Sequence, residues 1–340
     1  MPQDALYDDA PYRGGPVERL APTRALSEAL WRMPRSLYLG LDGWQDARWR
    51  GLIYTPSSSP KRLAQEGLRA YAQHPLLRTV ELPPSNPFGW SERALRVWNE
   101  QTPETFRFIV PITLPVLDPM QRDQRGASVA ENPQFLEPTS VDWSSVLGAP
   151  QTVLGDKRGP VVFRLAAFDR MQIVRWQQRG GLVDRLEAFF ETIKAQVDEP
   201  TSRLWALEVQ NAEWLTPRLM NMLKRQGLRP VVSLGMGMKA LVHQQRALAY
   251  WEGATEVEAW EPTGDVMIHW KNSPSLSLMY RPLNAQQLVA SDVVTRMMIV
   301  KLIERTLAAQ QRAWVWVGNR AEGSAPLSLI ALLEALLKTR

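Results

Sequence analysis

The stretch "WVWVGNRAEGSAP", residues 314–326, contains the pattern on which the fold prediction depends. Val315 and Val317 alternate with Trp314 and Trp316, which is the period of a β-strand. A small polar loop follows, and an apolar segment with the spacing of a helix closes the chain. A strand, a loop and a helix are the unit of a parallel α/β fold. The stretch raises the question of whether its loop binds a ligand or only closes the fold.

The same unit recurs along the chain. Short apolar strand segments are expected at 36–41, 77–82, 106–111, 160–165, 204–209, 230–234, 266–270 and 313–318. Segments with helical spacing lie at 60–73, 91–101, 182–197, 216–226, 238–251, 285–310 and 326–338. Strands that alternate with helices imply right-handed crossovers and a parallel sheet. Eight such units, with no glycine-rich fingerprint after the first strand, predict an α/β fold of the (β/α)8 TIM-type barrel class.

Two segments fall outside this repeating pattern. Residues 1–35 mix Pro, Gly, Asp and Arg, and they predict a flexible N-terminal arm with one short helix near Arg24 to Trp31. Residues 36–340 are expected to form a single barrel domain. Within it, the polar and Pro-rich segment 117–159 predicts an enlarged third βα loop. That connection opens onto the face where barrels bind ligands, so the insertion can cover the site; a mobile surface insertion is the alternative.

Composition excludes several classes of protein. The 340 residues contain no cysteine, which excludes disulfides, thiolate nucleophiles and Cys-ligated metal centres and favours a cytoplasmic location. The sequence shows no secretory signal and no membrane span, so no membrane partner is expected. The net charge is +5, but the basic residues are scattered among acidic ones. Such a pattern is more typical of a solvated surface than of a nucleic-acid footprint, although a nucleic-acid fragment remains a candidate partner.

The chain also resembles a known family. Its start resembles the first third of the YecE-like family, domain of unknown function 72, in "YLGLDGWQDARWRGLIY" (38–54), "TVEL" (79–82) and "RVWNEQTPETFRFIV" (96–110). Its end resembles the family's last strand and loop in "VWVGNRAEGSAPLS" (315–328), and "GPVVFRL", "ALEVQNAEW" and "VMIHW" occur in order between them. The resemblance spans residues 36–338. It implies a TIM-type barrel but no particular activity.

In that family, polar residues cluster at the C-terminal ends of the barrel strands. The positions that match here are Glu81, Glu208, Trp214, His269 and Asn319. Other positions depart from the family: Pro83 and Pro84 replace an Asn-containing stretch, Pro111 replaces a Lys, Gln210 and Asn211 replace an Arg and a His, Met267 and Trp270 replace an Arg and a Gly, and Gly318 replaces an Asn. The loss of a Lys and an Arg implies either a changed ligand or lost catalysis.

The catalytic candidates are Glu81, Glu208 and His269, which end predicted barrel strands and can converge on one mouth. Two neighbouring carboxylates can perform acid–base chemistry if one holds a proton while the other is ionised. The alternative is that each glutamate forms a structural salt bridge, with Arg107 and Arg164 as candidate partners. With three histidines in the chain, a multinuclear zinc site is not expected. No metal site is predicted. The alternative is a single Mg²⁺ or Mn²⁺ bound by Glu81 and Glu208. The sequence does not identify a cofactor.

The ligand-binding candidates are Asn319 in the last loop and four tryptophans that follow strands: Trp44, Trp49, Trp214 and Trp270. Indoles at a barrel rim can stack on sugars or unpaired bases. The alternative is that these indoles pack beneath the long third loop.

Two functions follow from these residues. The first is a pocket at the C-terminal face that binds a small polar ligand, such as a sugar, nucleotide or nucleic-acid fragment, and that can be hydrolytic. The second is a non-catalytic barrel that binds a protein partner or acts as a scaffold. Whether the chain is an enzyme is left open by the sequence, as are its substrate, its reaction and its oligomeric state.

Overall fold

The fold is known from a computed structural model, which describes residues 17–19, 21, 24–55, 59–86, 88–178, 181–197, 204–235, 237–272 and 285–339. Helix α1, Arg24–Trp31, lies where the sequence predicts a helix in the N-terminal arm. Most of the remainder of that arm falls outside the described residues. Among the described helices, none has both the length and the apolar character that crossing a bilayer requires.

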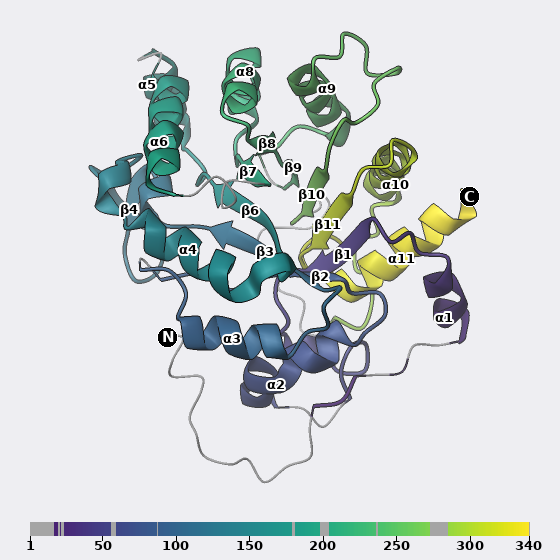
Figure 1. Cartoon of the computed structure of the whole chain (residues 1–340). Helices are drawn as coiled ribbons and strands as arrows, with labels where there is room; N and C mark the ends of the chain where they lie inside the picture. The colour runs from purple at the N-terminus through teal and green to yellow at the C-terminus, as the bar shows by residue number, and fades with distance from the viewer. Residues whose placement is uncertain are drawn as a thin grey trace.

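Nine short strands form one parallel sheet in the described residues (Figure 1). They are β1 Leu37–Leu41, β2 Thr79–Glu81, β3 Arg107–Ile112, β6 Arg158–Arg164, β7 Trp205–Glu208, β8 Arg229–Pro230, β9 Val232–Leu234, β10 Val266–Trp270 and β11 Ala313–Val317. Their order is β8-β7-β6-β3-β2-β1-β11-β10-β9. Only Val231 separates β8 from β9, so these two segments together form one strand of the barrel. Because β8 pairs with β7 and β9 pairs with β10, the ring closes. The predicted (β/α)8 barrel is confirmed.

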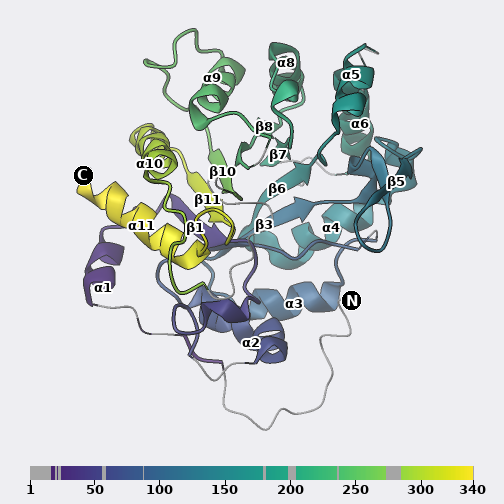
Figure 2. The same ribbon diagram turned by 180° about the vertical axis from the view of Figure 1, so that it is seen from behind.

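The helices surround this ring, as Figures 1 and 2 show. They are α2 Pro60–Ala72, α3 Glu92–Glu100, α4 Trp143–Leu154, α5 Arg170–Gln178, α6 Leu182–Gln196, α8 Pro217–Arg225, α9 Leu241–Glu252, α10 Val293–Ala308 and α11 Ala325–Lys338. The short 3-10 helices are η2 Ala47–Trp49, η3 Pro115–Leu117, η4 Pro138–Ser140, η5 Gly155–Lys157 and η6 Ala212–Trp214. Helix α10 begins later than predicted because Asp292 caps it, accepting a hydrogen bond from the Thr295 backbone N–H.

The segment predicted as an irregular insertion, 117–159, is more regular than expected. It contains an antiparallel hairpin of β4, Met120–Arg122, and β5, Ser128–Glu131. It then forms the crossover helix α4, which Asp142 caps through the backbone N–H of Ser145. The insertion is therefore a hairpin added ahead of an ordinary crossover helix. Helix α5 was also not predicted from the sequence.

Two tryptophans of the last strand fill the inside of the barrel. Trp314 stacks on Tyr38 with ring centroids 4.1 Å apart, and its indole nitrogen donates to Asp265 at 2.9 Å. Trp316 lies one layer nearer the C-terminal ends of the strands and stacks on His269. The other side chains of this inner cluster are Ile109, Val162, Ala206, Val231 and Met267. These side chains fill the inside of the barrel and are called the inner plug below. Charged side chains from the C-terminal ends of the strands therefore lie between this plug and the C-terminal opening of the barrel.

Candidate functional site

The C-terminal ends of the strands bring charged side chains together above the plug. Glu81 ends β2, Arg164 ends β6, Glu208 ends β7, His269 lies near the end of β10, and Asp42 directly follows β1. Side chains alternate between the two faces of a strand, and the residues two positions before Glu208 and His269, Ala206 and Met267, belong to the inner plug. The same alternation places the charged groups inside the barrel mouth.

Glu208 is the centre of the network and is fully buried. Its carboxylate accepts hydrogen bonds from Arg164 Nε at 2.8 Å and from Ser233 Oγ at 2.8 Å. It also lies 3.0 Å from His269 Nδ1 and 2.6 Å from Lys271 Nζ. Burial alone would raise the pKa of Glu208, but the charges of Arg164, His269 and Lys271 outweigh it and hold the pKa well below 4.5. Glu208 is therefore a buried carboxylate anion.

The guanidinium of Arg164 bridges the two glutamates. It donates to both carboxylate oxygens of Glu81, at 3.2 and 2.8 Å, while its Nε binds Glu208. Burial lowers the pKa of Arg164, but the two carboxylates outweigh that effect and raise it well above its ordinary value. The sequence predicts that, for acid–base chemistry, one glutamate holds a proton while the other is ionised. In the structure both pair with the same cation, as in the salt-bridge alternative.

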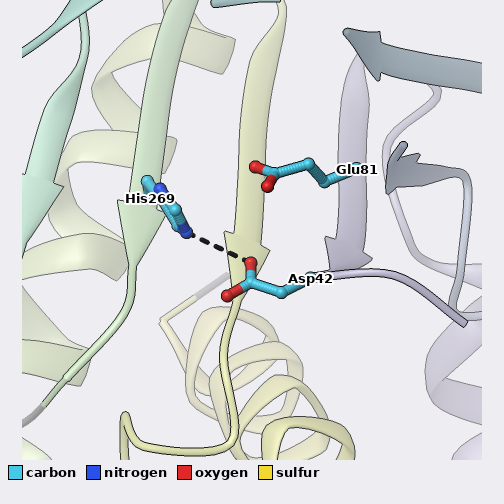
Figure 3. A group of neighbouring side chains, drawn as sticks. All are labelled: Asp42, Glu81 and His269. Atoms are coloured by element: carbon cyan, nitrogen blue, oxygen red, sulfur yellow. Dashed lines mark hydrogen bonds and ion pairs between the residues drawn. The ribbon is translucent and has the colours of Figure 1, made fainter. Parts of the chain in front are cut away.

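His269 lies between the carboxylates of Asp42 and Glu208. Its Nε2 is 3.1 Å from Asp42 Oδ1, the contact drawn as a dashed line in Figure 3. Its Nδ1 faces Glu208. Burial lowers the pKa of the imidazole, but Glu208 and Asp42 outweigh it, so the pKa is raised above 6.5. An imidazolium donates from both nitrogens. The approach of Arg164 Nη2 to His269 Nδ1 at 3.3 Å is then a contact between two cations rather than a hydrogen bond.

Asp42, Glu81 and His269 are also the group that can be tested as a metal site. One ligand atom from each lies within 4.8 Å of the others (Figure 3). Carboxylates suit Mg²⁺ or Mn²⁺. However, Glu81 already holds the Arg164 guanidinium, and a metal-bound imidazole must first lose its proton. The carboxylates of Glu81 and Glu208, considered from the sequence as a Mg²⁺ or Mn²⁺ pair, both bind Arg164 instead. The donor set fits a fixed organic cation better than a metal ion.

A cavity of about 310 Å³ opens beside the network. Arg164, Gln210 and Lys271 provide its polar groups. Gln210 accepts a hydrogen bond from Lys271 Nζ at 2.5 Å, which fixes both side chains at the wall. Its other walls are formed by Thr113, Leu114, Leu117, Ala166 and Ala167. The cavity therefore joins two cationic groups to an apolar wall supplied by the loops after β3 and β6.

The four tryptophans predicted to bind a ligand are all buried: Trp44, Trp49, Trp214 and Trp270. Trp44 is fully buried and packs edge-on against Trp98 of α3, with ring centroids 5.3 Å apart, rather than beneath the third loop. Trp214 packs in the same way against Phe168 at 5.2 Å, and it also lines a cavity of about 160 Å³. The structure therefore does not place these indoles in an exposed ring at the rim.

Asn319 lies beside the mouth and is held on several sides. Its Oδ1 accepts hydrogen bonds from Trp49 Nε1 and from the backbone N–H of Ala325, both at 2.9 Å. Its Nδ2 donates to Asp46 at 2.6 Å. The structure thus brings Glu81, Glu208 and His269 together and places Asn319 in the adjoining loop junction.

Comparison with known proteins assigns a family. A family model for a protein of unknown function, DUF72, matches residues 38–340, which is most of the chain. The chain belongs to the DUF72 family. This confirms the resemblance seen in the sequence, since the YecE-like family and DUF72 are one family. No curated protein matches the chain.

Several solved structures are similar to this chain. A DUF72 protein from Thermotoga maritima MSB8 has a TM-score of 0.54 at 14% identity, covering 88% of this chain and 99% of that one, and this likeness is one of fold. A DUF72 protein from Enterococcus faecalis V583 has a TM-score of 0.47 at 14% identity, covering 88% and 95%. A glycoside hydrolase family 5 enzyme from Prevotella bryantii B14 has a TM-score of 0.45 at 11% identity, covering 93% and 99%.

Three members of the DUF72 site were not recognised from the sequence: Asp42, Ser233 and Lys271. Lys271 could have been found, because it lies two residues after His269 and strand residues at that spacing share a face. It brings a lysine to this mouth although Pro111 occupies the family lysine position. Arg164 was considered only as a partner of the glutamates. Arg107, the other candidate partner, lies at the opposite end of its strand and donates to the Glu104 and Phe106 carbonyls.

Proposed function

We propose that the mouth of this DUF72 barrel binds a small polar ligand and exchanges a proton with it through Asp42. The observation that carries the proposal is the imidazole of His269, which has a carboxylate on each nitrogen. The side chain of Asp42 is 36% exposed, whereas that of His269 is 2% exposed. Asp42 is therefore the member that can meet a ligand, and His269 is the proton store behind it.

The remaining residues have positioning roles in this proposal. Glu208 orients His269 and keeps it charged, in the way that a buried carboxylate orients the histidine of a catalytic triad. Glu81 and Glu208 together fix Arg164 at the cavity wall. Arg164 and Lys271 then face the cavity, where positive charge can stabilise negative charge that develops on a ligand oxygen.

A sugar, a nucleotide or a nucleic-acid fragment has the oxygens that this wall can bind, and hydrolysis is one reaction that fits. In such a step water loses a proton to the Asp42 carboxylate and attacks the ligand. Asp42 then passes a proton to the leaving oxygen, and His269 Nε2 behind it exchanges protons with Asp42, so that Asp42 ends as the carboxylate and His269 as the imidazolium. The charges of the site are restored at the end of the cycle.

The experiment is a thermal-shift screen of the purified protein against sugars, nucleotides, short oligonucleotides and divalent metals. A ligand that binds only the folded state raises Tm. We expect one class to raise Tm in the parent, and the shift to shrink in Asp42→Asn and Lys271→Gln. Asp184→Asn is the control, because this carboxylate lies on the exposed surface of α6 and pairs with Arg218. A shift that persists in both mouth variants would contradict the proposal.

One observation favours a second candidate, a non-catalytic partner-binding or scaffold protein. Glu81, Glu208 and Arg164 satisfy one another without any ligand. A network of this kind can be retained for stability alone. If no compound in the screen raises Tm, while the variants change stability only, the scaffold function is the better account.

A further inference from the structure

A second cavity, of about 730 Å³, lies at the opposite end of the barrel from the mouth. It is bounded by α1 and by the segments that enter β1 and β2, because its lining includes Trp31, Arg35 and Arg78. In Figure 1, α1 lies beside α11, outside the ring of strands. Arg19, Ser27 and Gln73 complete the polar part of the lining. This cavity shares no residue with the mouth.

The charged groups of this cavity all have one sign. Among the described residues that line it, the ionisable side chains are Arg19, Arg35 and Arg78, with no carboxylate. Burial lowers the pKa of Arg78; Tyr38 opposes this effect, and the nearby charge of Arg35 adds to it. Burial and the charge of Arg19 lower the pKa of His74, beside the cavity, to about 4. The arginine charges therefore act on their neighbours at this end of the barrel, and Tyr38 offsets part of their effect on Arg78.

The cationic surface continues along the start of the sheet. Five neighbouring strands, β6, β3, β2, β1 and β11, each begin at an arginine or within two residues of one. These residues are Arg158, Arg107, Arg78, Arg35 and Arg312. The strands are parallel, so all five arginines lie at the same end of the barrel. Asp265, which pairs with Arg312 at 2.9 Å, is the carboxylate that offsets part of this charge.

Trp31 adds an aromatic surface to these cations. It is 91% exposed, the highest value for any large hydrophobic side chain in the described part of the chain. Seven other tryptophans are among the largest fully buried side chains. An exposed indole beside arginines is the combination that binds unpaired bases, because the ring stacks on a base and the cations pair with phosphates.

We propose that this end of the barrel binds single-stranded nucleic acid. A base stacks on Trp31, and the adjoining phosphates contact Arg19 and Arg35. The arginines at the strand starts extend the path for the backbone. A single strand is favoured over a duplex because a base must be unpaired before its face can lie on the indole. The site is independent of the proposed function at the mouth.

The test is fluorescence anisotropy of the full chain with a labelled single-stranded oligonucleotide, in DNA and RNA forms, of about 12 nucleotides. Trp31→Ala should weaken binding by roughly 5- to 100-fold, because that is the loss in affinity expected when one stack between a base and an indole is removed. Arg35→Gln should reduce the slope of log K against log salt by about 0.7, the value for one phosphate contact with a single strand. Both side chains lie at the surface, so the fold should persist.

Matched controls distinguish binding at this site from binding to exposed aromatic or cationic side chains elsewhere on the surface. Phe88→Ala removes another aromatic side chain that is 84% exposed, and Arg246→Gln removes an exposed arginine on α9. Both controls should bind as the parent does. Equal binding by Trp31→Ala and the parent, tighter binding of the duplex, or no binding at about 50 mM salt would overturn the proposal. Equal competition by polyglutamate would identify an acidic protein segment as the ligand instead.

Discussion

The side-chain oxygen of Asn319 accepts a hydrogen bond at 2.9 Å from the indole nitrogen of Trp49, which lies 270 positions earlier in the chain. The contact joins the loop after the last strand to the loop after the first, at the seam where β11 pairs with β1. The loop in "WVWVGNRAEGSAP" therefore closes the fold. The ligand-binding role of Asn319 stays a prediction.

Asn319→Ala should destabilise the protein by roughly 2–6 kcal/mol. The substitution leaves the indole N–H of Trp49 and the backbone N–H of Ala325 without an acceptor, and each such loss costs about 1–3 kcal/mol. Urea unfolding at neutral pH measures the change. A variant as stable as the parent would show that water replaces both bonds.

Asn319→Asp is the matched control, because it keeps the acceptor oxygens. It also places a second carboxylate against Asp46, which accepts from the Asn319 amide at 2.6 Å. The two negative charges should repel. The variant should therefore keep both hydrogen bonds but lose some stability to this repulsion, and the loss should shrink at high salt, which screens the two charges.

Most strands of the barrel can be predicted because they are buried on both faces. β11 and β10 consist entirely of buried residues, so their apolar runs stand out in the sequence. Helix α4 was missed because "WSSVLGAPQTVL" contains Gly148 and Pro150, which normally interrupt helices. Its proline is accommodated in the helix, at a buried position.

The site was predicted only in part, for a geometric reason. Glu81, Glu208 and His269 could be predicted because they end strands whose inward face follows from the alternation. Asp42 lies just beyond its strand, where strand spacing no longer fixes direction, whereas Lys271 keeps the spacing of β10. Trp44, Trp49 and Trp214 were misplaced for the same reason as Asp42: a position after a strand does not show whether an indole faces solvent or the core. Trp270 is the last residue of β10, and the alternation places it on the face opposite to His269.

Glu208→Gln should destabilise the protein by about 3–5 kcal/mol. The amide cannot neutralise Arg164, His269 and Lys271, and removing one partner of a buried ion pair leaves uncompensated charge in the interior. Urea unfolding measures the effect. Ser233→Ala is the control, because it removes one neutral donor to the same carboxylate. If both variants lose the same small amount, the buried charges are compensated in some other way.

The charge on His269 should make stability depend on pH. Its folded pKa is raised above 6.5, so its contribution to stability is complete below about pH 6.5 and is lost as the pH rises through the folded value. NMR titration of the imidazole protons measures the pKa directly, and with three histidines in the chain the resonances can be assigned by substitution. Asp42→Asn should lower the pKa of His269. An unchanged pKa of His269 in that variant would show that Asp42 does not act on His269, and it would contradict the proposed proton exchange between them.

His74 should give the opposite pH dependence at the other end of the barrel. Burial and the charge of Arg19 lower its pKa from 6.5 to about 4, and its Nδ1 accepts a hydrogen bond from the Leu76 backbone N–H, as a neutral imidazole can. Between these two values the unfolded chain binds the proton more tightly than the folded chain. The free energy of unfolding should therefore fall by about 3 kcal/mol as the pH drops from 6.5 to 4.

Urea unfolding at several pH values tests this dependence. His74→Asn should remove the decrease, whereas His243→Gln should keep it, because His243 lies on the exposed surface of α9. Arg19→Gln should raise the pKa of His74 and so make the decrease shallower, since it removes one of the two causes of the low value. An unaltered slope in Arg19→Gln would mean that burial alone sets the pKa of His74, and that the charge of Arg19 is screened at this end of the barrel.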